Sequence, residues 1–522
     1  MKANQRKILA DRKRKLQERL AQKAFKAQTE PMLEGVNLDY EISGRTVGIG
    51  TGGIGAFHKM VERLGLIEAL NDGVKVFKRH LPYFESDHIL SLCYNVLSGG
   101  TCLEDIELLR QDQMYLDALF VGRIPDPTTA GDFLRRFDEP CVLSLMDVIN
   151  QTRVKVWQAG SDKLGPKAVL DVDGTICSTD AQCKQGVDIS YNGVWGYAPL
   201  IVSLSNTKEV LYLVNRPGNA PSHLGAAAYI DQAIDLVCPY FEEVFVRGDT
   251  DFSLTENFDR WDARCRFVFG INAMSNLVEI AKGLSQGAFD PLLRKLKYTV
   301  QTTPRKKPDK VKPKIVKVRN FKTIHLVREE VAEFTYCPGK CKKTYRIVVL
   351  KKHLKITKGQ EVLGFEIRYL FYITNDWQMT PQQIVFFSNA RCDQENTIEQ
   401  LKNGIKALRM PSKDLVSNWA YMVCATLAWN LKAWYGLLCP DPILSKQLLC
   451  MEFRRFLNAF IRIPCQIIKT GRRIIYRILN YTLYFRSFLD RTCELSRDRV
   501  SFSSHALTRR NHVPTHDDFR TD

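Results

Sequence analysis

The chain has 522 residues, of which 75 are Lys or Arg and 57 are Asp or Glu, so its formal net charge is +18. This length favours two to four domains over one core, and 45% hydrophobic content excludes a largely disordered protein. The basic excess favours a polyanionic partner, with nucleic acid ahead of an acidic membrane. Because no apolar run reaches transmembrane length, no membrane partner is expected.

The N-terminal segment is charged throughout and has no signal peptide. The 15 cysteines follow no disulfide spacing. We therefore expect a cytoplasmic protein with reduced thiols.

Two regions precede the first strands. Residues 1–49 are predicted to form a basic arm and linker, and residues 1–27 carry ten Lys or Arg against two acids. This arm either follows DNA phosphates or is a solvated chain end.

Residues 50–165 have helical patterns, with a helix stop at Gly99 and Gly100. A helix, a turn and a second helix are typical of a DNA-binding unit, but also of any small helical bundle.

Residues 166–275 change to strand patterns. Three successive strands, in "AVLDVD", "VWGYAPLIVSLS" and "EVLYLVNRPG", precede a helix and then the strands "EEVFVRGD" and "RFVFGIN", which a second short helix separates. This order predicts an α/β fold with a ribonuclease H-like catalytic core, because a doubly wound sheet would place helices between the first strands.

The core is predicted to be interrupted by a basic, β-rich insertion over residues 276–365 and to resume over residues 366–412. Within residues 294–322 there are twelve Lys or Arg and one acid, which predicts a surface linker or a DNA-facing loop. One long helical pattern then runs from Pro381 to about Met410.

Residues 413–522 are predicted to form a helical, basic C-terminal region. Cations alternate there with large apolar residues at roughly helical spacing. This pattern fits an amphipathic helix packed on the core, or a contact with DNA or with a second protomer. The residues to test for such a contact are Arg454, Arg455, Arg472 and Arg473.

Paired acids end two of the predicted strands. Asp171 and Asp173 lie two positions apart at the end of the first strand, so alternation places them on one face. Asp249 and Asp251 follow the strand that contains Val244–Val246. Carboxylates at strand ends suit either a phosphatase nucleophile pair or a metal site.

A third acid, Glu395, belongs to the predicted helix. Arg391, Glu395 and Lys402 would fall within about 40° of one another on a continuous helix. An acid between two cations suits a site in which the acid holds a metal and the cations bind DNA phosphates. The alternative is an exposed helix with an ion pair one turn apart.

Together the three acids and the basic surroundings suit two-metal phosphoryl transfer. Two ions about 3.5–4 Å apart stabilise the attacking and leaving oxygens of such a displacement. Mg²⁺ is the expected ion because it prefers oxygen ligands, with Mn²⁺ able to substitute.

Several strings in order carry a resemblance to a known family. They are "SGGTCLEDIELLR", "PDPTTAGDFLRRF", "LDVDGT", "CKQGVDISYNGVWGYAPLIVSLSNT", "YLVNRPGNAPSH", "VRGDTDFS" and "RFVFGINA". Over most of residues 50–410 the chain resembles bacterial insertion-sequence DDE transposases of the family thirteen-eighty type, in the ribonuclease H-like superfamily. The resemblance implies an enzyme that cleaves insertion-sequence ends and joins them to target DNA.

The resemblance also implies roles for particular residues. Asp173, before Gly174 and Thr175, matches the first catalytic acid, and Asp249 matches the second. Arg391, Glu395 and Lys402 match the Arg, Glu and Lys of the family's signature, whereas Ser388 stands where the family has Tyr.

Further implications concern the neighbours of these residues and their partners. Asp171 and Asp251 are the alternative candidates for the roles of Asp173 and Asp249, although support of the adjacent acid is favoured over metal binding. The basic insertion is similar to one that holds the transposon end in related enzymes. Trp377 could match a Trp that aids a DNA hairpin there, although a packed core Trp is favoured. The expected partners are terminal inverted repeats, target DNA and a second protomer in a DNA-bound homodimer.

Two alternatives compete with this interpretation. A haloacid-dehalogenase-like phosphatase would use Asp171 as nucleophile and Asp173 as general acid. However, three strands follow the motif where that family has a helix, and the acids of "GDTD" are too close together. A non-catalytic DNA-binding protein would explain the charge but not the three acids, which repel phosphates without metal.

Overall fold

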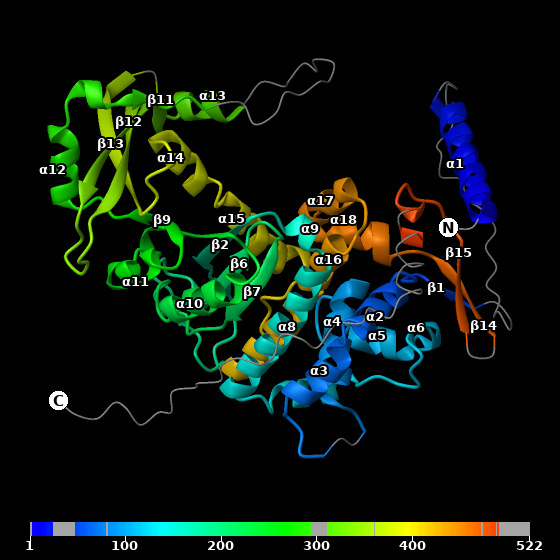
Figure 1. The fold of residues 1–522 in the computed structure, drawn as a ribbon. Coiled ribbons are helices and arrows are strands. Elements are labelled where there is room, and N and C mark those ends of the chain that lie inside the picture. Colours follow the sequence, from blue (N-terminus) through cyan, green and yellow to red (C-terminus); the bar gives the residue numbers. More distant parts are fainter. Residues whose placement is uncertain are drawn as a thin grey trace.

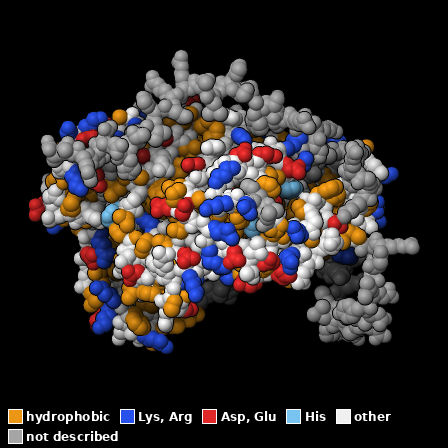
Figure 2. All heavy atoms as spheres, turned by 90° about the horizontal axis from the view of Figure 1, so that it is seen from below, with side chains coloured by type: hydrophobic (Ala, Val, Ile, Leu, Met, Phe, Trp, Pro, Cys, Tyr) orange, Lys and Arg blue, Asp and Glu red, His pale blue; other side chains and the backbone are white. Residues whose placement is uncertain are grey.

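The computed structural model of the chain describes residues 3–24, 47–79, 82–294, 311–359, 361–470, 473–486 and 488–489. This part of the chain has the predicted mixed α/β class, with a large sheet on one side and a helical region on the other (Figure 1). On the face shown in Figure 2, basic, acidic and hydrophobic side chains are interspersed. The basic excess therefore does not form one continuous patch on that face.

Five neighbouring strands at one end of the nine-stranded sheet form what we call the central sheet. They are β2 (Lys167–Gly174), β6 (Leu200–Leu204), β7 (Glu209–Val214), β8 (Glu243–Gly248) and β9 (Arg266–Ile271). Their spatial order is β9-β8-β2-β6-β7. The first three strands of this set in sequence are antiparallel neighbours, whereas β8 is parallel to β2 and β9 is parallel to β8. The sequence predicted five strands in this order along the chain, and their spatial order and pairing come from the structure.

Helices cover both faces of this sheet. On one face α10 (Ala226–Val237) contacts β2, β6, β7 and β8, and α11 (Phe258–Asp262) contacts β9. On the other face lie α14 (Pro381–Asn389) and α15 (Cys392–Glu399). The strands are buried on both sides, which explains why their sequences read as continuous apolar runs.

A small sheet lies between β2 and β6 in the chain. Its strands are β3 (Cys177–Ser178), β5 (Trp195–Tyr197) and β4 (Asp188–Ile189), in that spatial order. A backbone bridge joins Tyr197 to Pro217, so the small sheet packs on the segment that follows β7.

The insertion continues the central sheet. It comprises α12 (Ser275–Gly283), β10 (Asp290–Pro291), α13 (Val311–Val318), β11 (Lys322–Tyr336), β12 (Tyr345–Lys358) and β13 (Glu361–Thr374). The last residues of β13 pair antiparallel with β9. Residues 295–310, which hold much of the predicted basic run, lie outside the described residues.

The helical region contains α2 (Ile54–Arg63), α3 (Leu66–Gly73), α4 (Glu85–Ser98), α5 (Ile106–Gln111), α6 (Gln113–Ala118), α7 (Pro127–Leu134), α8 (Glu139–Ala159) and α9 (Ser161–Leu164). Through it runs α16 (Leu415–Leu437), which contacts α4, α8 and β7 and is almost wholly buried (Figure 1). A helix that is apolar on all sides needs neighbours on all sides. No helix in the described part of the chain is long and apolar enough to cross a membrane.

The described part of the C-terminal region is not helical throughout. After α17 (Pro442–Cys450) and α18 (Phe453–Phe456), the chain forms the antiparallel hairpin β14 (Cys465–Thr470) and β15 (Arg473–Ile478). The predicted helix over this segment is therefore wrong. Closely spaced Ile residues favour strands, and β14 also gains a partner in β1 (Gly48–Ile49). Arg472 and the side chain of Arg473 lie outside the described residues.

The predicted basic N-terminal arm contains the helix α1 (Ala3–Ala24). It lies beside the end of the C-terminal hairpin, where the Arg12 guanidinium donates hydrogen bonds to the carbonyls of Ile478 and Asn480. The two ends of the described chain are therefore in contact.

The predicted single helix from Pro381 to Met410 is also wrong. The chain forms α14, a break at Ala390 and Arg391, α15, and one π-helical turn over Gln400–Gly404. Tertiary bonds explain the break, because Arg247 binds the Phe387 carbonyl at the end of α14. Local helix propensity does not reveal such a bond.

Candidate active site

The candidate site lies at one edge of the central sheet. Asp173 is near the carboxyl end of β2, and Asp249 follows the carboxyl end of the parallel strand β8. Because carboxyl ends of neighbouring parallel strands meet at one edge, residues 76 positions apart in the chain become neighbours. We call this edge the catalytic edge.

Asp171 is not part of the open site. It is 1% exposed and accepts two hydrogen bonds from the Arg247 guanidinium, at 2.6 and 2.8 Å. Burial raises the pKa of Asp171, although the bonds from Arg247 oppose that rise. Held in this way, Asp171 cannot be the accessible nucleophile that the phosphatase interpretation requires.

Arg247 is a site residue that the sequence reasoning missed. It joins β8 to β2 through Asp171, bonds the Phe387 carbonyl of α14 at 2.8 Å, and stacks on the Phe387 ring. It therefore fixes the strands that carry Asp173 and Asp249 against the helix pair that carries Glu395. In the sequence, the feature that could have identified Arg247 is its place in an apolar strand, two positions before Asp249.

Asp173 has a different environment from Asp171. Its carboxylate accepts a hydrogen bond of 2.7 Å from the Arg391 guanidinium. Burial raises the pKa of Asp173 to about 6; Arg391 opposes the rise, and the charges of Asp249 and Glu395 add to it. Asp173 thus lies close enough to Asp249 and Glu395 to be repelled by both, although the sequence separates the three acids widely.

Asp249 is held by the turn that it begins. Its carboxylate accepts the backbone N–H of Asp251 at 3.0 Å. Burial raises the pKa of Asp249, with an opposing effect from Arg391 and a further rise from the charge of Asp251. The Asp251 side chain itself is exposed, so its support of Asp249 comes from its backbone.

A cavity of about 280 Å³ opens beside these acids. Its walls come from the ends of β8 and β9, from β13 and from the α14–α15 segment. The lining residues are Gly248, Asp249, Thr250, Gly270, Ile271, Leu370, Phe371, Tyr372, Ser388, Asn389, Arg391, Cys392 and Glu395. Ser388, at the position of the family's Tyr, is therefore a wall residue.

The helix that carries Glu395 is fixed by its neighbour Gln394. This buried side chain accepts a hydrogen bond from the Ser203 hydroxyl and donates one to the Ile201 carbonyl, both on β6. Nothing in the sequence singles out Gln394, because a polar residue on a helix is ordinary. Its role appears only when α15 lies across β6.

Lys402 is separate from the cavity. It lies in the π-helical turn after α15, where its charge opposes the burial that raises the pKa of Cys177 on β3. The structure thus brings together Asp173, Asp249, Glu395 and Arg391, and places Lys402 on the side of the small sheet.

The donor set suits a hard cation such as Mg²⁺. The converging ligands are all carboxylates, and oxygen ligands favour Mg²⁺ over Zn²⁺. Among the described residues no group of three or more His, Cys, Asp or Glu is close enough, as placed, to hold a metal ion. Instead, the Arg391 guanidinium supplies positive charge to Asp173.

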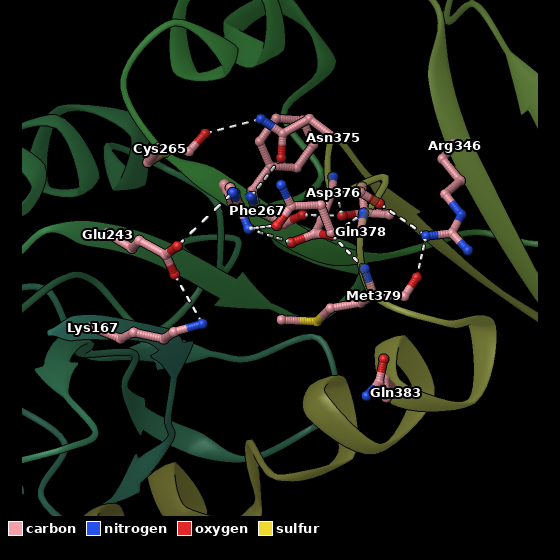
Figure 3. Close-up of polar contacts among 12 residues, drawn as sticks. Lys167, Glu243, Cys265, Phe267, Arg346, Asn375, Asp376, Gln378, Met379 and Gln383 are labelled. Atoms are coloured by element: carbon pink, nitrogen blue, oxygen red, sulfur yellow. Dashed lines mark hydrogen bonds and ion pairs between the residues drawn. The ribbon is translucent and has the colours of Figure 1, made fainter.

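Trp377 is neither a core residue nor a neighbour of this cavity. Its side chain is 57% exposed, so the favoured interpretation of a packed Trp is wrong. Its loop lies where Thr374 pairs with Val268, toward the start of β9, whereas the cavity lies at the end of β9. Bonds from Arg346, Arg266 and backbone groups to residues 375–379 hold this loop (Figure 3).

The fold and this acidic edge fit the class of DDE transposases, and comparison with known proteins agrees. The sequence matches the family described as "Transposase DDE domain group 1" over residues 31–499. The chain therefore belongs to this family, and it is a transposase that acts on DNA.

Other comparisons add little. No curated protein matches the chain. Among solved structures, the chain is similar to that titled "Cryo-EM structure of piggyBac transposase synaptic complex with hairpin DNA", with 12% identity. The match covers 88% of this chain and 87% of the other, with a TM-score of 0.37. A likeness this low carries no argument about mechanism.

Proposed function

We propose that the chain is a bacterial insertion-sequence transposase of the family thirteen-eighty type, with a ribonuclease H-like core. In this proposal it cleaves the ends of its element and joins them to target DNA by two-metal phosphoryl transfer. The observation that carries the proposal is the meeting of Asp173, Asp249 and Glu395 at one sheet edge beside a cavity. The strand order of the central sheet supports the assignment of the core.

The three acids and two cations have proposed tasks. Asp173, Asp249 and Glu395 would hold two Mg²⁺ ions, which supply charge stabilisation to the attacking and leaving oxygens when bound. Arg391 lines the cavity and donates to Asp173. Its guanidinium would also bind a DNA phosphate, for which the planar fork of N–H donors is suited. Lys402 would bind a second phosphate from outside the cavity.

The proposal includes partners and place. The DNA partners are the terminal inverted repeats and the target, and pairing of two ends calls for a homodimer on DNA. The protein would act in the cytoplasm, associated with the nucleoid when it is bound to DNA.

The direct test is cleavage of a labelled duplex that carries the element's end, with and without Mg²⁺. Asp173→Asn, Asp249→Asn and Glu395→Gln should each abolish nicking, as should EDTA. Asp251→Asn is the matched control because its side chain lies outside the cavity, and it should keep most of the activity. Nicking that survives in all three variants would contradict the assignment.

A further inference from the structure

A buried cation lies at the catalytic edge without an assigned task. Arg216 follows the carboxyl end of β7 by two residues. Register places this end beside Asp173, because Gly174 pairs with Leu200 and Leu200 pairs with Val214. The motif "NRPGNAPSH" that contains Arg216 thus begins at the edge that carries the catalytic acids.

Backbone carbonyls hold most of the Arg216 guanidinium. Nε donates to the Ala198 carbonyl at 2.9 Å. Nη1 donates to the carbonyls of Pro221, Ser222 and Leu224, at 3.3, 2.9 and 2.7 Å. These bonds fix the turn between β7 and α10 against the segment that enters β6. They account for the position of the side chain, but not for its whole hydrogen-bonding capacity.

The rest of the guanidinium lacks a partner. Arg216 is 6% exposed, and its Nη2 has no hydrogen-bond partner among the described residues. No carboxylate in the described part of the chain forms an ion pair with it, and burial lowers its pKa to about 10. A buried, unpaired charge is costly. A neutral hydrogen-bond donor could hold the turn between β7 and α10, so fixing this turn does not by itself explain a buried charge.

Gly174 and Ser222 lie directly against Nη2, so this nitrogen has almost no contact with solvent. A Cβ at Gly174 would lie 3.6 Å from Nη2 and 3.3 Å from the Ser222 hydroxyl oxygen. Because side chains alternate along a strand, this position is on the face of β2 opposite the Asp173 side chain. Nη2 lies within roughly 9 Å of the Asp173 Cα, given the 3.8 Å spacing of adjacent Cα atoms.

We propose that Arg216, with Ser222, forms a binding site for a DNA phosphate next to the one that is cleaved. A strand crossing the catalytic edge would place one phosphate at Asp173, Asp249 and Glu395, and a neighbour at Arg216 on the other side of β2. A phosphate oxygen would accept from Nη2 after a rotation of the half-exposed Ser222 side chain. This site rests on the proposed function, because the cleaved phosphate defines its place.

The test uses a substitution that places a carboxylate beside the Arg216 guanidinium, where the phosphate is proposed to bind. Replacement of Arg216 would free four carbonyl contacts and risk the fold, so the informative variant is Ser222→Asp. Its carboxylate would pair with Nη2 and compete with phosphate. Ser222→Asn is the neutral match of similar shape. Asn219→Asp, on the same exposed turn, reports the general effect of one added negative charge near DNA.

Metal-free binding of a labelled element-end duplex is measured by anisotropy over a series of salt concentrations, together with thermal melting. Relative to Asn219→Asp, Ser222→Asp should bind about tenfold more weakly, as expected for one lost charge-assisted contact. Its salt slope should fall by about one unit. Its melting temperature should rise, because the buried guanidinium gains a partner.

Two assays distinguish the source of the phosphate. Loss of element-end binding assigns it to the transposon end. Intact end binding, with reduced joining of a pre-cleaved end to a plasmid, assigns it to target DNA. If Ser222→Asp matches Asn219→Asp in both assays, the phosphate site is refuted. That result leaves the catalytic assignment standing, because the latter is judged by cleavage in the Asp173, Asp249 and Glu395 variants.

Discussion

Asp171 and Asp173 both lie on β2, but their positions along the strand give them different surroundings. Asp171 is inside the sheet, where both its oxygens are bound by Arg247. Asp173 is at the catalytic edge, where one bond from Arg391 balances repulsion from Asp249 and Glu395. The two residues share a face and are one pleat repeat apart. The inner acid is satisfied, and the outer one is crowded by like charges.

Crowded carboxylates are costly to a fold unless a cation neutralises them, so their presence points to function. A buried ion pair whose hydrogen bonds are satisfied needs no ligand, and removal of one partner leaves the other charge buried and unpaired. The same substitution should therefore have opposite consequences at the two positions.

The largest effect is expected for Asp173→Asn. Loss of a metal-binding carboxylate removes several kcal/mol of transition-state stabilisation, so the cleavage rate should fall by about a thousandfold. The melting temperature of the metal-free protein should stay level or rise, because one of three repelling charges is gone. Single-turnover cleavage and thermal melting are the two measurements. A large loss of stability would place Asp173 with the structural acids instead.

Asp171→Asn should instead destabilise the fold, by about 3 kcal/mol, because it leaves Arg247 buried without a counter-charge. Urea unfolding measures this loss. The double variant Asp171→Leu with Arg247→Met removes both charges and should recover much of it. If the double variant is no more stable than Asp171→Asn, the ion pair is not the cause.

A smaller effect is expected for Arg391→Gln, about tenfold in metal-free DNA affinity. Its stability should change by less than about 1 kcal/mol, since part of its contact with Asp173 is exposed to solvent. Lys402→Gln tests the cation outside the cavity. Because the two residues lie in different places, their effects on affinity should add. Strong coupling between them would mean that both bind one phosphate.

The effect that is smallest at neutral pH concerns a buried group without an ionic bond. Burial lowers the pKa of His88 to about 4, and its ring stacks on Phe133. The unfolded chain binds a proton near pH 6.5, so stability is full above that pH. It should fall by up to about 1.4 kcal/mol per unit as the pH drops toward 4. His88→Phe removes the titration, and the difference between the two proteins in urea unfolding isolates it.

Much of the catalytic edge could be predicted from the sequence. Asp173 and Asp249 each end an apolar run, and strand ends are where α/β sheets present functional groups. The order of the five strands along the chain also followed from local patterns, because turns and helices alternate visibly, whereas their spatial order did not. The supports of these acids could not be predicted. Gln394 and Arg247 act through partners that are far away in the chain, on β6, β2 and α14.

The errors have the same origin. Residues 465–478 carry cations and apolar residues at spacings compatible with a helix, yet they form a hairpin that pairs with β1. The helix predicted through Arg391 breaks where Arg247 takes a carbonyl at the end of α14. In both cases a distant partner outweighed the local preference of the chain, which is worth only a fraction of a kcal/mol per residue.

The sequence by itself determined which residues could do chemistry: acids at strand ends, an acid on a later helix, and an excess of basic side chains. Tertiary structure alone decided which of them meet, placing Asp173, Asp249 and Glu395 together and leaving Lys402 and Trp377 elsewhere. The physical reason is that residue type sets charge and ligand strength, whereas proximity depends on register and packing across the whole sheet.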